Sequence, residues 1–164
     1  MPEYYDRYIN LVPDVELSYA FDDSIRQLDS LDRNLLATLA GKRYAPGKWT
    51  VNDIVQHLTD TERIFSYRTL LYARRDGTIP QGFDQNQLVV NAGAGRRSID
   101  ELLRELTMLR RATMSMFECF DDETMGCKGI CWDYEITVLG MGFNIIGHQI
   151  HHFNIIREKY YPLL

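Results

Sequence analysis

Apolar residues recur at every third or fourth position through four long segments of the chain. This spacing puts the apolar side chains on one face of an α-helix and leaves the other face polar. The predicted helices run from about Val15 to Leu39, from Thr50 to Arg75, from Ser98 to Phe120 and from Thr137 to Lys159. No strand-like alternation of useful length competes with them. The sequence therefore predicts an all-α fold, a four-helix bundle.

Polar residues suited to capping precede several of these helices. Thr50 is followed three positions later by Asp53, which resembles a capping box with Asp in place of Glu, and Ser98 with Glu101 has the strict form of that motif. Asp14 is the predicted cap of the first helix. The helix starts are therefore well marked.

The connection between the second and third predicted helices is unusually long. It covers about 22 residues, contains several glycines and a proline, and is predicted to be irregular. Antiparallel neighbours need only about 2 to 8 residues. An extended chain of this length spans roughly 70 Å and a predicted helix roughly 35 Å, so the two helices can run parallel. We expect an up, down, down, up bundle with a crossover between helices two and three, rather than a simple meander.

Length and composition favour one domain over residues 1–164. The 164 residues are 45% hydrophobic and 25% charged, which is enough to build a core without disulfides or metals. A net charge of -5 would repel a phosphate backbone, so nucleic-acid binding is disfavoured. No leader-like segment follows Met1 and no apolar run approaches the roughly 18 residues of a membrane span. We expect a soluble, cytoplasmic protein with no membrane segment.

The cysteines give no evidence of a disulfide framework. There are three of them, an odd number, at positions Cys119, Cys127 and Cys131. Cys127 and Cys131 lie in a loop-like stretch with no second Cys or His pair nearby. Free thiols in a reducing compartment are therefore favoured over a zinc knuckle.

All four histidines fall in two predicted helices. At about 100° per residue, His148 and His152 lie about 40° apart along the border of the apolar arc of the last helix. His57 lies at the corresponding border of the second helix. His151 faces farther round, among polar residues, since adjacent positions point apart. Three of the four imidazoles can thus face a cleft between helices, whereas His151 is either a surface residue or a supporting neighbour.

Three imidazoles without a carboxylate or thiolate suggest a metal site of the catalytic type. Neutral imidazole binds Zn, Ni, Fe or Cu, and three protein nitrogens leave coordination positions for water or substrate. The alternative is that these are ordinary hydrogen-bonded side chains at the edge of the core. The spacing of His148 and His152 alone does not decide between the two.

Two motifs of the chain resemble the DinB/YfiT-like superfamily. The first is Lys48–Leu58, with the sequence KWTVNDIVQHL, followed by Glu62 five residues after His57. The second is Gly147–His152, with the sequence GHQIHH. Each alone is weakly specific, but the combination of Trp-x7-His with a terminal His-x3-His is more so. The resemblance covers nearly the whole chain, including the helix count and the long central connection.

Members of that superfamily are four-helix bundles of up, down, down, up topology, often homodimeric, and many bind a divalent metal through three histidines. The resemblance implies that the metal ligands here are His57, His148 and His152. It also implies a divalent ion such as Zn, Ni or Fe. Metal identity cannot be read from three imidazoles.

The resemblance further implies an activity. Some relatives transfer a low-molecular-weight thiol such as bacillithiol, mycothiol or glutathione, and others are described as metal-dependent hydrolases. We therefore expect an enzyme that transfers a thiol cosubstrate to a small electrophilic substrate, or hydrolyses that substrate, as a homodimer. The alternative is a non-catalytic bundle that binds a metal or ligand at a structural or vacant site.

Asp60 and Glu62 are the carboxylates nearest to His57 in the sequence. Either one can orient a ligand imidazole or act as a general base. The helical angle turns Glu62 toward the apolar arc and Asp60 away from it, which favours Glu62. The alternative for Glu62 is a salt bridge to an arginine of a neighbouring helix. Trp49 is predicted mainly as a hydrophobic staple before the Thr50 cap, with a place in a pocket wall as the less favoured alternative.

Overall fold

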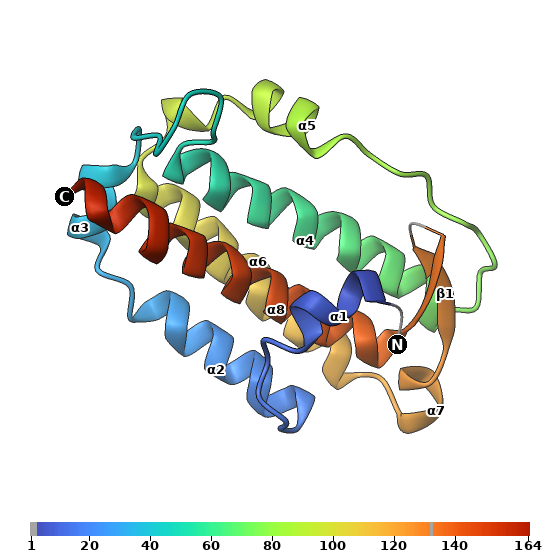
Figure 1. Ribbon diagram of the computed structural model, residues 1–164. Helices are drawn as coiled ribbons and strands as arrows, with labels where there is room; N and C mark the ends of the chain where they lie inside the picture. Colours follow the sequence, from blue (N-terminus) through green and yellow to red (C-terminus); the bar gives the residue numbers. More distant parts are fainter. Residues whose placement is uncertain (1–2, 132) are drawn as a thin grey trace.

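Four α-helices of 13 to 23 residues form the body of the protein (Figure 1). They are α2 (Leu17–Asp29), α4 (Val51–Ala73), α6 (Ile99–Glu118) and α8 (Val138–Ile155). The computed structural model describes residues 3–131 and 133–164. The mostly helical architecture that the apolar period predicts is confirmed.

Side-chain caps set the starts of three of these helices. The Thr50 hydroxyl accepts a hydrogen bond from the Asp53 N–H at 3.1 Å, and the Asp53 carboxylate accepts one from the Thr50 N–H at 2.9 Å. Ser98 and Glu101 form the same reciprocal pair before α6. Thr137 caps α8 by accepting from the third N–H of the helix at 2.9 Å. The starts predicted at these three positions are confirmed because each cap satisfies a donor that the helix itself cannot.

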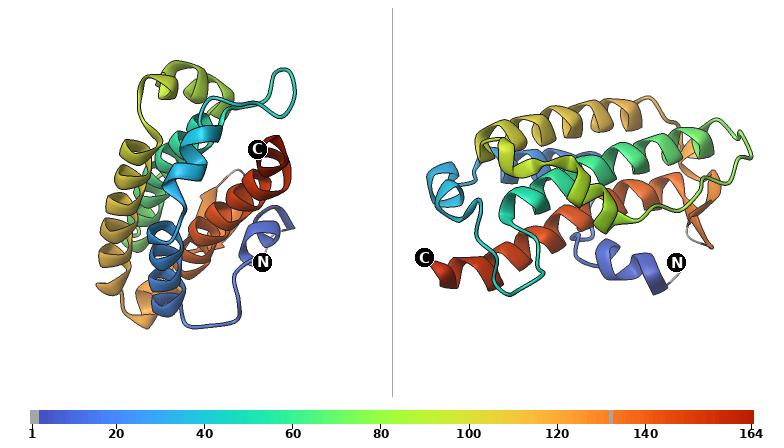
Figure 2. Two further views of the ribbon diagram at one scale, coloured as in Figure 1. Left: turned by 90° about the vertical axis from the view of Figure 1, so that its left-hand side faces the viewer. Right: turned by 90° about the horizontal axis from the view of Figure 1, so that it is seen from above.

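The long helices pack so that α4 contacts α6 and α8 while α2 contacts the same two helices (Figure 2). The short helix α3 (Arg33–Leu39) lies at the end of the bundle where α4 and α6 begin (Figure 1). Helices α2 and α8 run toward that end. Apolar side chains fill two core clusters along the bundle, one around Phe21 and Met141 and one around Leu28 and Leu103. Within the described residues, no helix has the length and apolar character needed to cross a membrane.

The prediction of one continuous first helix is wrong. Helix α2 ends at Asp29, and the Asp32 carboxylate starts α3 by accepting the Leu35 N–H at 2.9 Å. A side chain that bonds the backbone in this way competes with helix continuation. The apolar period carries across the break because Leu28 and Leu36, on either side, are buried in the same core cluster.

The predicted cap of the first helix is also wrong. Glu16, not Asp14, occupies the cap position of α2, and it makes no side-chain hydrogen bond to the helix. The start of α2 therefore depends on packing more than on capping.

The prediction that the chain has no strands is wrong. Strands β1 (Lys128–Cys131) and β2 (Tyr134–Thr137) form an antiparallel hairpin, with Gly129 opposite Ile136. The hairpin packs on α4, where the Tyr72 hydroxyl donates to the Ile130 carbonyl at 2.7 Å. A Cβ on Gly129 would lie 2.0 Å from the Tyr72 ring, so glycine is required for this close approach. Each strand has four residues, too few for alternation to be recognised.

Other short elements complete the fold. Helix α1 (Glu3–Ile9) packs on α8, and α7 (Asp122–Met125) follows α6. The connection predicted to be irregular contains α5 (Gln85–Ala92), which the Asp84 carboxylate caps, so that prediction is wrong in part. After α8 the chain continues as a π-helix over Ile156–Tyr160, so the helical segment ends close to the predicted end near Lys159.

Candidate metal centre

Three of the four histidines converge between α4 and α8. His57 comes from the second turn of α4, and His148 and His152 lie one turn apart on α8. The His148 Nε2 atom is 3.2 Å from that of His57 and 3.1 Å from that of His152. One ligand nitrogen from each ring lies within 4.8 Å of the others. The structure thus brings together the three histidines that the helical angles turn toward one cleft.

The donor set of this cluster fits a divalent cation. A neutral imidazole nitrogen carries either one proton or one lone pair, so His148 Nε2 cannot make full hydrogen bonds to both neighbours. Nitrogen–metal bonds of 2.0 to 2.1 Å at tetrahedral angles place two nitrogens about 3.3 Å apart, close to the separations found here. One cation satisfies all three lone pairs, whereas hydrogen bonds between the rings do not. In the described part of the chain, no other group of His, Cys, Asp and Glu side chains has a geometry suited to a metal.

Burial keeps these imidazoles neutral. Removal from water lowers the pKa of His57 from its ordinary value of 6.5 to about 4. Burial also lowers the pKa of His148 and His152 well below the ordinary value, and repulsion from neighbouring imidazoles adds to that effect. The three rings therefore offer unprotonated nitrogens at neutral pH, the state that a metal requires.

Thr61 and Trp49 support the ring of His57. The Thr61 Oγ1 atom lies 3.3 Å from His57 Nδ1, and both side chains are buried. If Nδ1 donates to this hydroxyl, Nε2 is left with its lone pair directed at the cluster. The Trp49 ring packs 4.7 Å from the ring of His57. Trp49 also packs on the second core cluster, as a staple would, so it has both a structural contact and a place beside the histidines.

Helix α1 reaches the cluster because Gly147 has no side chain. A Cβ at Gly147 would lie 2.0 Å from the Tyr8 carbonyl oxygen, so only glycine allows the two backbones to approach this closely. The Tyr8 ring then packs edge-on to His148 at 5.1 Å and to His151 at 5.2 Å. His151 is half-buried beside the cluster and is not one of its three converging rings.

The histidines line a pocket of about 430 Å³. Its other walls include Arg7 and Tyr8 from α1, Phe65 from α4, and Phe83 with Asn86 from the segment before and at the start of α5. Sequence reasoning missed these residues because tertiary packing, not helical period, brings α1 and the crossover segment to the cluster. A pocket wall was the less favoured interpretation of Trp49, yet this side chain lines the pocket as well.

Glu62 lies in the core in an ion pair with Arg110. The Arg110 Nη2 donates to one carboxylate oxygen at 2.9 Å and Nε donates to the other at 3.0 Å. Arg110 also donates to the Ser24 hydroxyl at 2.7 Å. Glu62 and Arg110 are 3% and 1% exposed, so neither charge has access to water. This contact is the salt bridge to a neighbouring helix that was the alternative to a catalytic or orienting role for Glu62.

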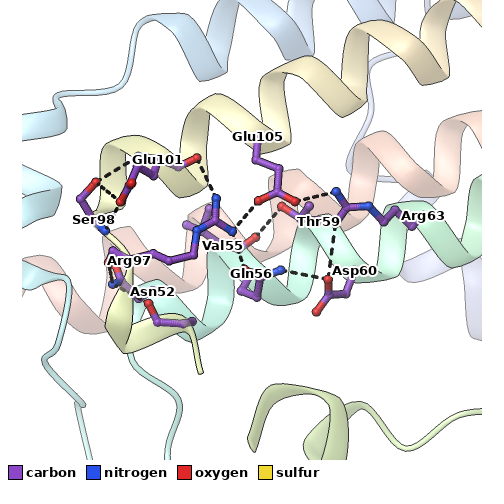
Figure 3. A network of polar contacts seen from close by, with 11 residues as sticks. Asn52, Val55, Gln56, Thr59, Asp60, Arg63, Arg97, Ser98, Glu101 and Glu105 are labelled. Atoms are coloured by element: carbon purple, nitrogen blue, oxygen red, sulfur yellow. Dashed lines mark hydrogen bonds and ion pairs between the residues drawn. The ribbon is translucent and has the colours of Figure 1, made fainter. Parts of the chain in front are cut away.

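Asp60 belongs to a polar network between α4 and the start of α6 (Figure 3). It accepts a hydrogen bond from Gln56 at 2.9 Å and pairs with Arg63 at 3.6 Å. Arg63 in turn pairs with Glu105 of α6, as does Arg97. Neither Asp60 nor Glu62 is among the described residues that line the histidine pocket.

In the described residues, the cysteines form no disulfide and no metal-binding arrangement. Cys131 is buried and accepts a hydrogen bond from Arg68 at 2.8 Å. Cys127 accepts one from Arg75 at 3.4 Å. The two sulfurs therefore have separate arginine partners.

Comparisons with known proteins agree with the geometry. The family model of the DinB superfamily matches residues 20–156. No curated protein shows significant similarity to the chain. The chain is similar in fold to YfiT from Bacillus subtilis, which is described as a probable metal-dependent hydrolase with an unusual four-helix bundle topology. The two are 17% identical, with a TM-score of 0.72 over 99% of this chain and 90% of the other. Because the family model spans most of the sequence, including all three converging histidines, the chain belongs to the DinB superfamily.

Proposed function

We propose that the protein is a divalent-metal-dependent enzyme that acts on a small electrophilic substrate, with His57, His148 and His152 as metal ligands. The observation that supports this proposal most is the convergence of three buried, neutral imidazoles at the wall of a pocket. Structural zinc sites are usually closed by four protein ligands, whereas catalytic sites keep a position open. Three ligands beside a pocket of about 430 Å³ match the catalytic kind.

The chain's own residues have definable roles in this proposal. Thr61 holds the His57 ring in the orientation that directs Nε2 at the cluster. Trp49 and Phe65 add apolar wall to the pocket beside the histidines. When bound, a divalent cation supplies Lewis acidity, which lowers the pKa of a coordinated water or thiol so that it is a nucleophile near neutral pH. Zn, Ni and Fe are all compatible with three imidazoles.

Hydrolysis and thiol transfer are both consistent with such a site. The description of YfiT as a probable metal-dependent hydrolase favours hydrolysis. The family resemblance alone supports transfer of a low-molecular-weight thiol cosubstrate. Glu62 stays a prediction as a general base or as a residue that orients a ligand imidazole, and its buried ion pair with Arg110 favours the structural alternative.

Several finer features belong to the same proposal. The bundle order that we propose is up, down, down, up within a single domain, with residues 76–97 as the crossover. It is supported by the common end at which α4 and α6 begin (Figure 1). A homodimer in the cytoplasm is inferred from family resemblance and composition. The net charge of -5 supports a small-molecule substrate over nucleic acid.

Elemental analysis combined with histidine substitutions tests the assignment. We expect about one divalent ion per chain, lost in His57→Ala, His148→Ala and His152→Ala but largely retained in the matched control His151→Ala. Turnover of an activated ester, or transfer of a thiol to a model electrophile, should follow metal content. Equal metal loss in all four variants would contradict the ligand assignment.

The non-catalytic alternative predicts a different pair of results. A structural metal would raise the melting temperature strongly, and no ester or thiol substrate would turn over even in the fully loaded protein. A protein that binds metal at the three histidines but has no activity on either substrate class would therefore support a binding module.

A further inference from the structure

A second and larger cavity lies at the end of the bundle where α2 begins and α6 ends (Figure 1). Its volume is about 730 Å³, within the usual range for small-molecule sites. Four phenylalanines and two methionines line it: Phe21, Phe117, Phe120, Phe143, Met114 and Met125. Among the described residues, none that lines this cavity also lines the histidine pocket. The cavity is therefore a separate candidate site.

The cavity has a buried aromatic floor, formed by Phe21 and Phe117, and a more flexible part of the wall nearer the solvent. Phe21 and Phe117 are 1% and 2% exposed, and their ring centres lie 5.2 Å apart within the core. Met114, Met125 and Phe143 are half-buried and pack against that core from the solvent side. Methionine is flexible and fits ligands of different shape. An apolar group can therefore enter the cavity without disturbing the bundle.

Carboxylates alone provide the charge around this cavity. Asp14, Glu16, Glu118 and Asp122 line it, and all four are exposed. No Lys, Arg or His is among the described lining residues. In the described part of the chain, none of the four carboxylates takes part in an ion pair. No direct salt bridge within the described residues therefore neutralises these carboxylates.

The combination of an apolar wall and an acidic rim selects a particular ligand chemistry. A carboxylate ligand would be repelled by the rim, and an uncharged apolar ligand would gain nothing from it. An organic ammonium with an apolar body gains from both, because aromatic faces also attract cations. The Arg74 guanidinium lies 5.9 Å from the Phe120 ring centre, although Arg74 is not a lining residue. Phe120 therefore already makes one cation–π contact, from outside the cavity.

We propose that this cavity binds a small amphipathic cation, an organic ammonium whose apolar body is held by the aromatic floor and whose charge faces the acidic rim. The site is independent of the metal-dependent function proposed above. Its occupant would be either a second ligand or an effector of the enzyme.

Isothermal titration of the full chain with octyltrimethylammonium, below its micelle concentration, tests this proposal. Octanoate and octanol provide anionic and uncharged probes with the same tail. Exposed charges contribute weakly one by one, so four carboxylates should make the cation bind about tenfold more tightly than octanoate. The preference should shrink as salt is raised, because exposed charges are screened.

Two kinds of variant locate the binding. Leu139 lines the cavity and is 41% exposed, so Leu139→Trp should narrow the cavity without disturbing the core and change the affinity for all three octyl probes. The double variant Glu16→Gln/Glu118→Gln should weaken binding of the cation about threefold and leave binding of octanol unchanged. Asp22→Asn/Glu158→Gln removes two exposed charges elsewhere and is the matched control. Circular dichroism checks that each variant is folded.

The possible results separate clearly. Failure of the cation to bind, or equal affinity for octanoate, overturns the proposal. If Glu16→Gln/Glu118→Gln and its control variant weaken binding of the cation equally, the charge of the ligand does not face the acidic rim. We expect His57→Ala to bind the cation as well as the original protein does. Loss of binding in this variant would show that the cation binds in the histidine pocket instead. Since metal content and activity do not enter these measurements, failure here leaves the proposed enzymatic function unaffected.

Discussion

At the scale of single residues, Thr61 is the side chain whose contact most directly affects the cluster. Its hydroxyl lies 3.3 Å from His57 Nδ1. Thr61→Val keeps the shape but leaves that buried nitrogen without a partner and its proton unfixed. We expect the affinity for a divalent ion to fall about tenfold, measured by competition with a chromogenic chelator.

Thr61→Ser is the matched control, because it keeps the hydroxyl and removes only a methyl group. It should bind metal nearly as well as the original protein. An unchanged dissociation constant in Thr61→Val would show that the hydroxyl does not orient His57. Nitrogen chemical shifts of the imidazole, which report the tautomer, give a readout that does not depend on activity.

The buried ion pair of Glu62 and Arg110 supports a second prediction at this scale. Arg110→Met leaves a carboxylate in the core without its cation, which typically costs about 3 to 5 kcal/mol of unfolding free energy. Glu62→Met likewise leaves the Arg110 guanidinium in the core without its anion. The double variant Glu62→Met/Arg110→Met removes both charges and should regain most of that stability. Urea unfolding measures all three, and a double variant as unstable as either single one would contradict this account.

At the scale of secondary-structure elements, the sequence predicted the features that depend on local chemistry. Thr50, Ser98 and Thr137 mark helix starts because a cap needs only neighbouring residues. The break before α3 and the hairpin were missed for a different reason. The apolar period spans the break at Asp32. The strands are stabilised by packing on the long helices, β1 on α4 and β2 on α8, instead of by their own pattern.

The contact between α1 and α8 gives a prediction for Gly147. In an exposed helix, Gly→Ala is worth up to about 1 kcal/mol in favour of the helix. At Gly147 the new Cβ would lie 2.0 Å from the Tyr8 carbonyl, so α1 must move away. We expect Gly147→Ala to destabilise the protein by about 1 to 3 kcal/mol and to speed hydrogen exchange in α1.

Gly41→Ala is the control for Gly147→Ala, because a Cβ at Gly41 meets nothing within 4 Å. It should leave hydrogen exchange in α1 unchanged. If the amide hydrogens of α1 are as well protected from exchange in Gly147→Ala as in the original protein, the close approach of Tyr8 does not hold α1 in place. The packing of Tyr8 against His148 and His151 would then need another cause.

At the scale of the whole molecule, the candidate site is only half visible in the sequence. His57, His148 and His152 were identified from helical angle and motif, since their position depends on two regular helices. Arg7 and Phe83 reach the pocket from α1 and the crossover segment, and no local pattern encodes that meeting. Sequence therefore predicts the converging histidines better than the pocket walls that would select a substrate.

The same three histidines should make the stability of the metal-free protein depend on pH. The pKa of His57 is about 4 in the folded protein and 6.5 when exposed, so the unfolded chain binds more protons between these values. Stability is therefore fully present above pH 6.5 and is lost as pH falls toward 4. For His57 alone the total loss is about 3 kcal/mol. Burial lowers the pKa of His148 and His152 in the same direction, which adds to the loss.

Thermal unfolding in the presence of a chelator, at several pH values from 7.5 to 4.5, measures this effect. Carboxylates with a lowered pKa, such as Glu105, also destabilise the fold when they are protonated, so the total pH dependence does not isolate the histidines. His57→Gln provides the separation, because it removes one buried imidazole and leaves every carboxylate in place. The variant should lose less stability than the original protein between pH 6.5 and 4.5. Parallel curves for the two proteins would mean that the pKa of His57 is the same in the folded and the unfolded chain. Burial would then not hold this imidazole neutral, and the metal-free cluster would not be preformed for metal binding.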